Sequence, residues 1–281
     1  MSEWAFLRSG RWAGYLALVI VFAIVCCALG TWQLNRRAEA LAEVARIDAN
    51  YDGASMPITD ALPDLAAFDV DQRWQKVELS GEYLPGDEVV VRNRPYQGSS
   101  GYEVVTPFRL DDGTIFFVDR GWVPQADEGG PAEYAPAPTG HVEQVARLKA
   151  GEPRIAGRTT VGDEVATIDL AELSERVGEP SYTGAYGLLV HETSARDHAP
   201  VAALRPVRDE GPHLSYALQW FVFALLGFIG LAWAANQERK GLAEASVSVE
   251  RTERTERATK PAREPRTRSD ADIEDEILDR R

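Results

Sequence analysis

Residues 12–33 read WAGYLALVIVFAIVCCALGTWQ and residues 214–237 read LSYALQWFVFALLGFIGLAWAANQ, and neither run contains Asp, Glu, Lys or Arg. These two apolar runs decide the architecture of the chain. At about 1.5 Å per residue, a helix of roughly 22 residues covers about 33 Å, and the hydrocarbon core of a bilayer is about 30 Å thick. The runs therefore predict transmembrane helices over residues 12–34 and 213–236.

A cleavable signal peptide is the alternative for the first run, because Arg8 and Arg11 precede it. The run is longer than the roughly 7 to 15 residues of a signal core, and residues 28–30 form only a passable cleavage site. Trp12 and Trp32 stand near its two ends, as in an interfacial aromatic belt. This pattern favours a retained anchor.

The acidity of the chain lies between the two runs. Of the net charge of −14, Lys and Arg minus Asp and Glu give +2 for residues 1–36, −15 for residues 37–212 and −1 for residues 213–281. Phosphate backbones and anionic headgroups repel such a central domain, which argues against nucleic-acid binding. The two cysteines lie inside the first run, so the centre has neither a disulfide nor a thiolate metal site.

The central segment is rich in short strands. Apolar residues at helical spacing up to Tyr51 extend the first helix beyond the membrane, and Gly53 ends it. The alternation of apolar and polar residues then changes to a period of two, and Asp111-Asp112-Gly113 reads as a hairpin turn. Strands are expected over residues 76–83, 88–94, 102–110, 114–120, 142–148 and 186–191.

Between these strands we expect a long loop over residues 127–139 and a short helix over residues 169–177, with Asp169 as N-cap and Gly178 after its end. Consecutive strands with few helices predict an antiparallel, β-rich α+β domain, barrel-like or sandwich-like, over residues 35–212. After Gln237 the apolar periodicity is lost, and residues 237–281 are expected to be a disordered charged tail.

Two spans place both ends of the chain on one side of the membrane. Lys and Arg are nearly balanced across each span, and only the basic residues of the tail favour a cytoplasmic C-terminus. We therefore expect residues 1–11 and 237–281 in the cytoplasm and residues 35–212 outside it; the inverted topology stays open on the residues alone.

No enzyme signature is visible: the sequence has no phosphate-binding glycine loop, no G-x-S-x-G, no H-E-x-x-H and no C-x-x-C. Two clusters stand out in the first half of the chain. Trp32 and Gln33, at the outer end of the first span, suit an interfacial anchor. The second cluster comprises Arg92, Arg94, Arg120, Gly121 and Trp122.

For the second cluster two interpretations are open. In the structural one, an arginine pairs with a carboxylate such as Asp119, and Trp122 packs in the core beside Gly121. In the functional one, Arg92, Arg94 and Arg120 form a surface that binds a partner protein.

The third cluster opens the second span. His213, Tyr216 and Trp220 occur at i, i+3 and i+7 and so share one helical face. One interpretation is interfacial anchoring with a hydrogen bond to the other helix. The other is a cofactor pocket, because a neutral imidazole is a good ligand for iron and aromatic rings pack against a porphyrin.

In this order, the clusters resemble the Surfeit locus protein 1 family, assembly factors of heme-copper cytochrome c oxidase, in its bacterial-type form. The resemblance covers roughly residues 12–236. It departs from the family pattern near Ala40, where a Lys is often found, and in the length of the tail. It rests on GTWQ (30–33) with Arg36, GEY (81–83), Arg94-Pro95 with Gly98 and Gly101, Thr106-Pro107, RGWVP (120–124) and HLSYALQWF (213–221).

The resemblance implies a non-enzymatic protein of the plasma membrane, with the central domain outside the cytoplasm. It implies help in delivering or retaining heme a for the catalytic oxidase subunit. His213 is then the candidate iron ligand, and Tyr216, Trp220, Trp32 and Gln33 are the candidate heme contacts. Membrane lipid and oxidase subunits are the expected partners. The alternatives are a protein that binds no heme and holds oxidase subunits or a respiratory supercomplex together, and an outward-facing membrane enzyme.

Overall fold

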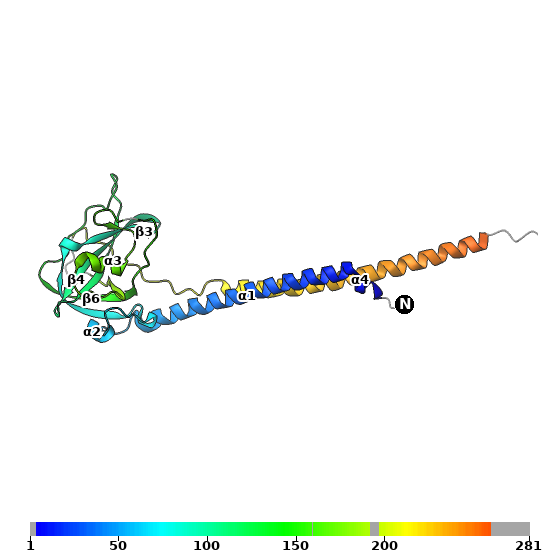
Figure 1. Ribbon diagram of the computed structural model, residues 1–281, viewed down its shortest axis with the longest axis horizontal. Helices are drawn as coiled ribbons and strands as arrows, with labels where there is room; N and C mark the ends of the chain where they lie inside the picture. The colour runs from blue at the N-terminus through cyan, green and yellow to red at the C-terminus, as the bar shows by residue number, and fades with distance from the viewer. Residues whose placement is uncertain (1–3, 159, 192–196, 260–281) are drawn as a thin grey trace, which may run out of the picture. The chain divides into compact units, whose positions relative to one another are not determined.

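The computed structural model describes residues 4–158, 160–191 and 197–259 (Figure 1). It divides into two compact units: residues 1–34 together with residues 214–281, and residues 35–213. The first unit is helical and the second contains the β-sheet.

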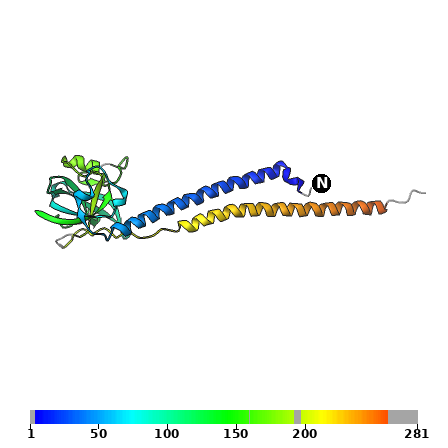
Figure 2. The same cartoon turned by 90° about the horizontal axis from the view of Figure 1, so that it is seen from below.

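The helical unit pairs two long helices. A short 3-10 helix, η1 (Ala5–Arg8), precedes α1 (Gly10–Asn50), and α4 (His213–Thr259) is the last helix. Both are long and apolar enough to cross a membrane. The apolar part of α1 lies along α4 in both views (Figures 1 and 2). A Cβ added to Gly30 would lie 2.8 Å from the Phe221 ring, and Gly227 faces Phe22. The glycines therefore permit an antiparallel, close approach.

A polar clamp joins the same two helices near the N-terminus. The Glu238 carboxylate forms an ion pair with Arg11 and accepts a hydrogen bond of 3.1 Å from Trp12 Nε1. Trp12 is buried, and Arg239 lies 5.0 Å from the centre of the Trp4 ring. An antiparallel pair tied at both a glycine contact and an ion pair has a defined register.

The expectation of a disordered segment from residue 237 is wrong up to Thr259, where α4 ends. A helix that continues from a preformed span needs no new nucleation, and Ala, Glu and Arg are good helix formers. Thr252 Oγ1 donates to the Ser248 carbonyl oxygen at 2.9 Å within this helix. Residues 260–281 of the expected tail lie outside the described residues.

Six strands of the second unit lie close to those expected, with ends displaced by up to a few residues, and two further strands of two residues each were not expected. The helical elements are α2 (Ile58–Ala61), η2 (Val70–Gln72), η3 (Pro85–Asp87) and α3 (Leu170–Val177). The strands are β1 (Met56–Pro57), β2 (Lys76–Tyr83), β3 (Val89–Tyr96), β4 (Ser99–Leu110), β5 (Ile115–Pro124), β6 (His141–Ala150), β7 (Glu164–Val165) and β8 (Ala185–Leu189).

Five of these strands close into a barrel in the order β2-β6-β8-β5-β4, because β4 also pairs with β2. The predicted β-rich fold between two apolar helices is therefore confirmed, and the barrel is the form it takes. Four of the barrel pairs are antiparallel, and β5–β8 is parallel. A parallel pair needs a long crossover, and here the chain from β5 to β8 includes β6 and α3.

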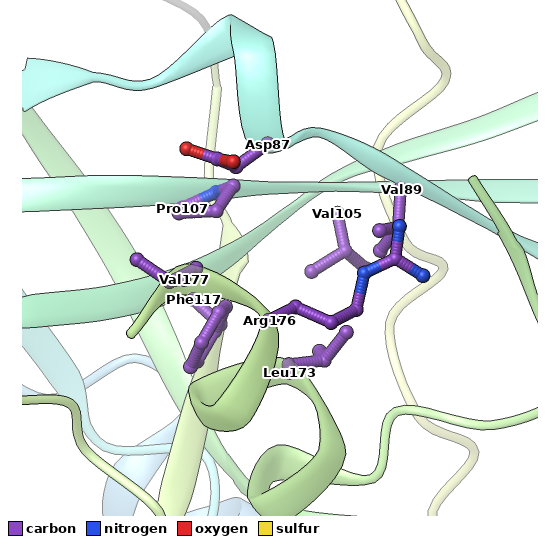
Figure 3. Close-up of a pocket in the computed structure, with 8 residues that line it drawn as sticks. All are labelled: Asp87, Val89, Val105, Pro107, Phe117, Leu173, Arg176 and Val177. Atoms are coloured by element: carbon purple, nitrogen blue, oxygen red, sulfur yellow. The ribbon is translucent and has the colours of Figure 1, made fainter. Parts of the chain in front are cut away.

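Apolar side chains fill two layers. One cluster takes residues from all five barrel strands, including Leu79, Phe108 and Phe116, and forms the barrel interior. The other lies between α3 and the outer faces of β3, β4, β5 and β8. Figure 3 shows the crevice between α3 and the strands, with Leu173 and Val177 on α3 and Val105 and Phe117 on the strands. The crevice has no room for a water molecule. As predicted, Asp169 caps α3 by accepting from the next helical N–H groups.

The part of α1 beyond the apolar run packs against the barrel domain. Ile47 is 1% exposed. The Glu43 carboxylate accepts hydrogen bonds from Trp74 Nε1 at 2.8 Å and from Arg73 at 3.1 Å. Asn50 donates to the carbonyl oxygens of Asp71 and Arg73. These contacts explain why α1 stays helical up to Asn50.

Candidate functional site

Arg120 lies on a β-bulge. Opposite β4, Gly121 pairs with Val104 and Asp119 with Val105, so Arg120 is the extra residue of β5. Gly121 has φ +133°, and a Cβ there would lie 2.4 Å from the Val201 carbonyl oxygen. A bulge re-aims a side chain, and the Arg120 side chain is fully buried.

Inside the domain, Arg120 meets a carboxylate that sequence reasoning did not identify. Its guanidinium lies 3.2 Å from Glu88 Oε2 and donates to the Ala135 carbonyl oxygen at 2.9 Å. Glu88 also accepts hydrogen bonds from Thr106 Oγ1 at 2.5 Å and Tyr134 Oη at 2.9 Å. The prediction that Arg120 binds a partner is therefore wrong, and its structural interpretation holds with Glu88 as the carboxylate.

Trp122 is half-buried, so its expected place in the core is corrected. Its indole stacks on Tyr96 with centroids 5.0 Å apart, and its Nε1 donates to the Arg94 carbonyl oxygen at 2.9 Å. A Cβ on Gly101 would lie 2.5 Å from the ring. The Trp122 side chain therefore covers the β3–β4 hairpin. The Trp122 backbone pairs with Val201 through two hydrogen bonds of 2.7 Å.

Arg94 joins two carboxylates on the outside of the barrel. Its Nη2 lies 2.5 Å from Glu152 Oε2, and its Nε lies 2.9 Å from Glu103 Oε2 without hydrogen-bond alignment. Arg92 is half-buried and borders the same surface pocket as Arg94. The structure therefore brings Arg92 and Arg94 together and separates both from Arg120; their partner-binding role stays a prediction.

A buried acidic group lies beside Arg94. Asp119 is 2% exposed, and its Oδ1 accepts a hydrogen bond of 2.9 Å from the Gly121 N–H. Burial, reinforced by the Glu103 carboxylate, raises the pKa of Asp119 to about 8. Burial also raises the pKa of Glu103 and, well above its ordinary range, that of Tyr186. At neutral pH the Asp119 carboxyl is therefore largely protonated.

Sequence reasoning missed this cluster because its residues come from strands far apart in the chain. One signal was present: Asp119 interrupts the otherwise apolar stretch of β5 from Ile115. A carboxylate in such a strand needs either a partner or a proton.

His213 is the first residue of α4. Before it, Gly211 has φ +68°, and a Cβ there would lie 3.1 Å from His213 Nε2. The Gly211 N–H donates to Asp209 Oδ1 at 2.8 Å. The imidazole is half-buried and lies against Gly211. A side chain at position 211 would collide with the imidazole ring.

The segment over residues 201–212 ties His213 to the domain. It starts at the Val201 backbone pairing with Trp122 and continues with ion pairs to the outer part of α1. Glu210 pairs with Arg37 at 2.8 Å, and Arg208 pairs with Asp48 at 2.8 Å. His213 is therefore held as part of the same unit as the barrel domain.

The other candidate heme contacts divide into two groups. Residues of low exposure recur at 19, 23, 26, 30 and 33 in α1, and at 217, 220, 224, 227 and 231 in α4. Alternating steps of three and four mark the facing sides of paired helices. Gln33 and Trp220 lie on these sides, whereas Trp32 is 56% and Tyr216 49% exposed. Tyr216 therefore lies to one side of the face that Trp220 shares with His213.

Within the described residues, no group of three His, Cys, Asp or Glu side chains could hold a metal ion. The roles of His213, Tyr216, Trp220, Trp32 and Gln33 stay predictions.

Comparison with known proteins gives the family. The model of the SURF1 family matches residues 20–225. A SURF1-like protein of Mycobacterium tuberculosis is 32% identical over 247 residues, 85% of this chain and 88% of that protein. One from Rickettsia bellii is 27% identical over 225 residues, 73% and 84% of the two chains. The yeast cytochrome oxidase assembly protein is 31% identical over 110 residues, 38% of this chain and 28% of the yeast protein. This chain therefore belongs to the SURF1 family, the Surfeit locus protein 1 family that its motifs resemble.

Proposed function

We propose that this protein assists the assembly of a heme-copper cytochrome c oxidase by delivering heme a to the catalytic subunit or retaining it there, with no turnover chemistry of its own. Family membership and the assembly role in the name of the yeast relative support the oxidase as target. The position of His213, at the start of the apolar helix α4, supports heme as the group that is delivered.

The residues present fit a heme by the chemistry of the donor, because a neutral imidazole is a good ligand for iron. The His213 ring is half-buried and packs against Gly211, where a Cβ would lie 3.1 Å from Nε2. His213 would bind the iron, and Trp220, about two helical turns further along α4, would pack its ring against the porphyrin. Gln33, Trp32 and Tyr216 are the further candidate contacts. A bound heme would supply the redox-active iron of the oxidase; this chain only holds and orients it.

His213→Ala tests the ligand role. At equal membrane abundance, we expect the variant to lose most of the heme a that co-purifies with the parent, because alanine offers iron no ligand. An optical spectrum of the purified protein measures this loss. His141→Ala is the matched control, since His141 is exposed and contacts Asp111 on the hairpin.

A His213→Ala variant that keeps its heme would contradict the ligand role. If both parent and variant carry no heme yet bind oxidase subunits equally, the protein is a structural factor that holds subunits together. That second candidate is favoured by the arginine-lined pocket beside Arg94.

We also propose that residues 35–212 lie outside the cytoplasm and both termini inside it. The exposed Gly129 loop and the C-terminus are suitable reporter sites. A reporter active only outside the cytoplasm should work at residue 129 and fail at residue 281. The reverse pattern would mean that the topology is inverted.

A further inference from the structure

We propose that a pocket between β3 and residues 152–167 binds an Asp or Glu side chain on the surface of an oxidase subunit; this rests on the proposed function. The pocket has a volume of about 270 Å³ and opens to solvent. Arg92, Asn93, Arg94, Glu152, Pro153, Ile155, Arg158, Ala166 and Thr167 line it.

The floor of the pocket is preformed. Arg94 and Glu152 are each 19% exposed and pair at 2.5 Å. Glu152 is fixed in turn, because its Oε2 accepts from the Ile168 N–H at 3.1 Å and its own N–H donates to the Ile168 carbonyl oxygen at 2.8 Å. Ile168 is fully buried in the layer under α3. A rigid Arg94 loses little side-chain entropy when it binds a further carboxylate.

A turn presents a second guanidinium at the rim. The Arg158 N–H donates to the Ile155 carbonyl oxygen at 3.2 Å, and Gly157 has φ +77°. Positive φ at the third residue is the geometry of a type II turn, which glycine favours. No ion pair of Arg158 occurs among the described residues. The turn therefore holds a charged donor at the pocket mouth.

The charges select the ligand. Three guanidiniums and one carboxylate, Glu152, line the pocket, and Glu152 already pairs with Arg94. The lining therefore carries more positive than negative charge, in a domain that carries −15 overall. A carboxylate suits this lining, because planar guanidiniums can bind it with two parallel hydrogen bonds.

An apolar wall completes the fit to a side chain. Ile155 is 39% exposed and stands beside Pro153 in the lining. These groups suit the methylene stem of Glu or Asp, and the guanidiniums suit its carboxylate. A protein partner offers both groups on one side chain.

Arg158→Glu tests the pocket, with Arg154→Glu as the matched control. Arg154 is exposed on the same segment but does not line the pocket. With the full-length protein in nanodiscs and purified oxidase subunits, we expect Arg158→Glu to weaken binding by at least about tenfold and Arg154→Glu to change it little. Both variants should melt at the parental temperature.

A photoreactive residue at Ile155 should cross-link to an acidic segment of one oxidase subunit, and Lys at the cross-linked acid should restore binding to Arg158→Glu. If Arg158→Glu and Arg154→Glu weaken binding equally, or if the cross-linked segment contains no Asp or Glu, the pocket does not bind an acidic side chain, and the proposed function still stands. A parent protein that binds no oxidase subunit would contradict both.

Discussion

Replacing Arg120 by Met should destabilise the barrel domain by about 3 kcal/mol or more. The Arg120 side chain is fully buried and the Glu88 side chain is only 14% exposed, so the variant leaves a carboxylate without its cation. Breaking one side of a buried ion pair costs about 3 to 5 kcal/mol. The Ala135 carbonyl oxygen also loses its donor. Thermal unfolding of the full-length protein in detergent, followed by tryptophan fluorescence, measures the loss.

Two further variants make the Arg120 test specific. Arg92→Met removes an arginine that is only half-buried, and we expect a loss below about 1 kcal/mol. Adding Glu88→Gln to Arg120→Met should recover part of the stability, because no unpaired charge remains. A single Arg120→Met variant as stable as the parent would show that the pair does not hold the bulge.

Stability should fall as the pH rises from about 4 to about 8, and Asp119→Asn should remove much of that fall. Burial raises the pKa of Asp119 to about 8 in the folded domain, against an ordinary value of 3.8. The folded state therefore holds a proton that the unfolded state releases, and stability is greatest below the unfolded pKa. Above about 8 this contribution is lost.

The groups that face Asp119 act in different pH ranges. The pKa of Glu103 is raised by burial, so Glu103 adds to the fall. Burial tends to raise the pKa of Glu152, but the Arg94 hydrogen bond and charge outweigh it and lower that pKa, so Glu152 acts below pH 4.5. Tyr186 stays protonated throughout, because burial raises its pKa further. Lys149 and Arg94 lower the pKa of Asp119 in part.

Melting temperatures of parent and Asp119→Asn between pH 4 and 9 give the measurement. The variant should show a flatter profile and should be the more stable of the two above pH 8. Asp127→Asn, at an exposed loop position, is the control and should follow the parent. A parent profile that rises toward pH 8 would contradict a protonated Asp119.

Local patterns in the sequence predicted the individual elements well. The alternation in residues 76–83 became β2 at the same limits because one face of that strand is buried. Asp169 and Gly178 set the limits of α3 because a cap and a left-handed glycine act within one helical turn. The two long apolar helices could be predicted from the length and composition of the apolar runs alone.

Contacts between residues far apart in the chain could not be predicted from the sequence. The Glu88 carboxylate meets Arg120, 32 positions later, and nothing local marks that pair. The parallel pairing of β5 with β8 likewise depends on how the chain crosses the barrel. Low complexity misled the prediction beyond Gln237, because the chain there continues a helix that already exists. Among the candidate heme contacts, helical spacing correctly placed Trp220 on the side of α4 that faces α1. It wrongly placed Tyr216 on the same side, because Tyr216 is 49% exposed.

The most direct test of the proposed function is the heme a content of the oxidase catalytic subunit in cells that lack this protein. We expect a catalytic subunit that is made but depleted of heme a, restored by the parent chain and not by an equally abundant His213→Ala variant. A catalytic subunit with its full heme a content in the absence of this protein would contradict the proposed function.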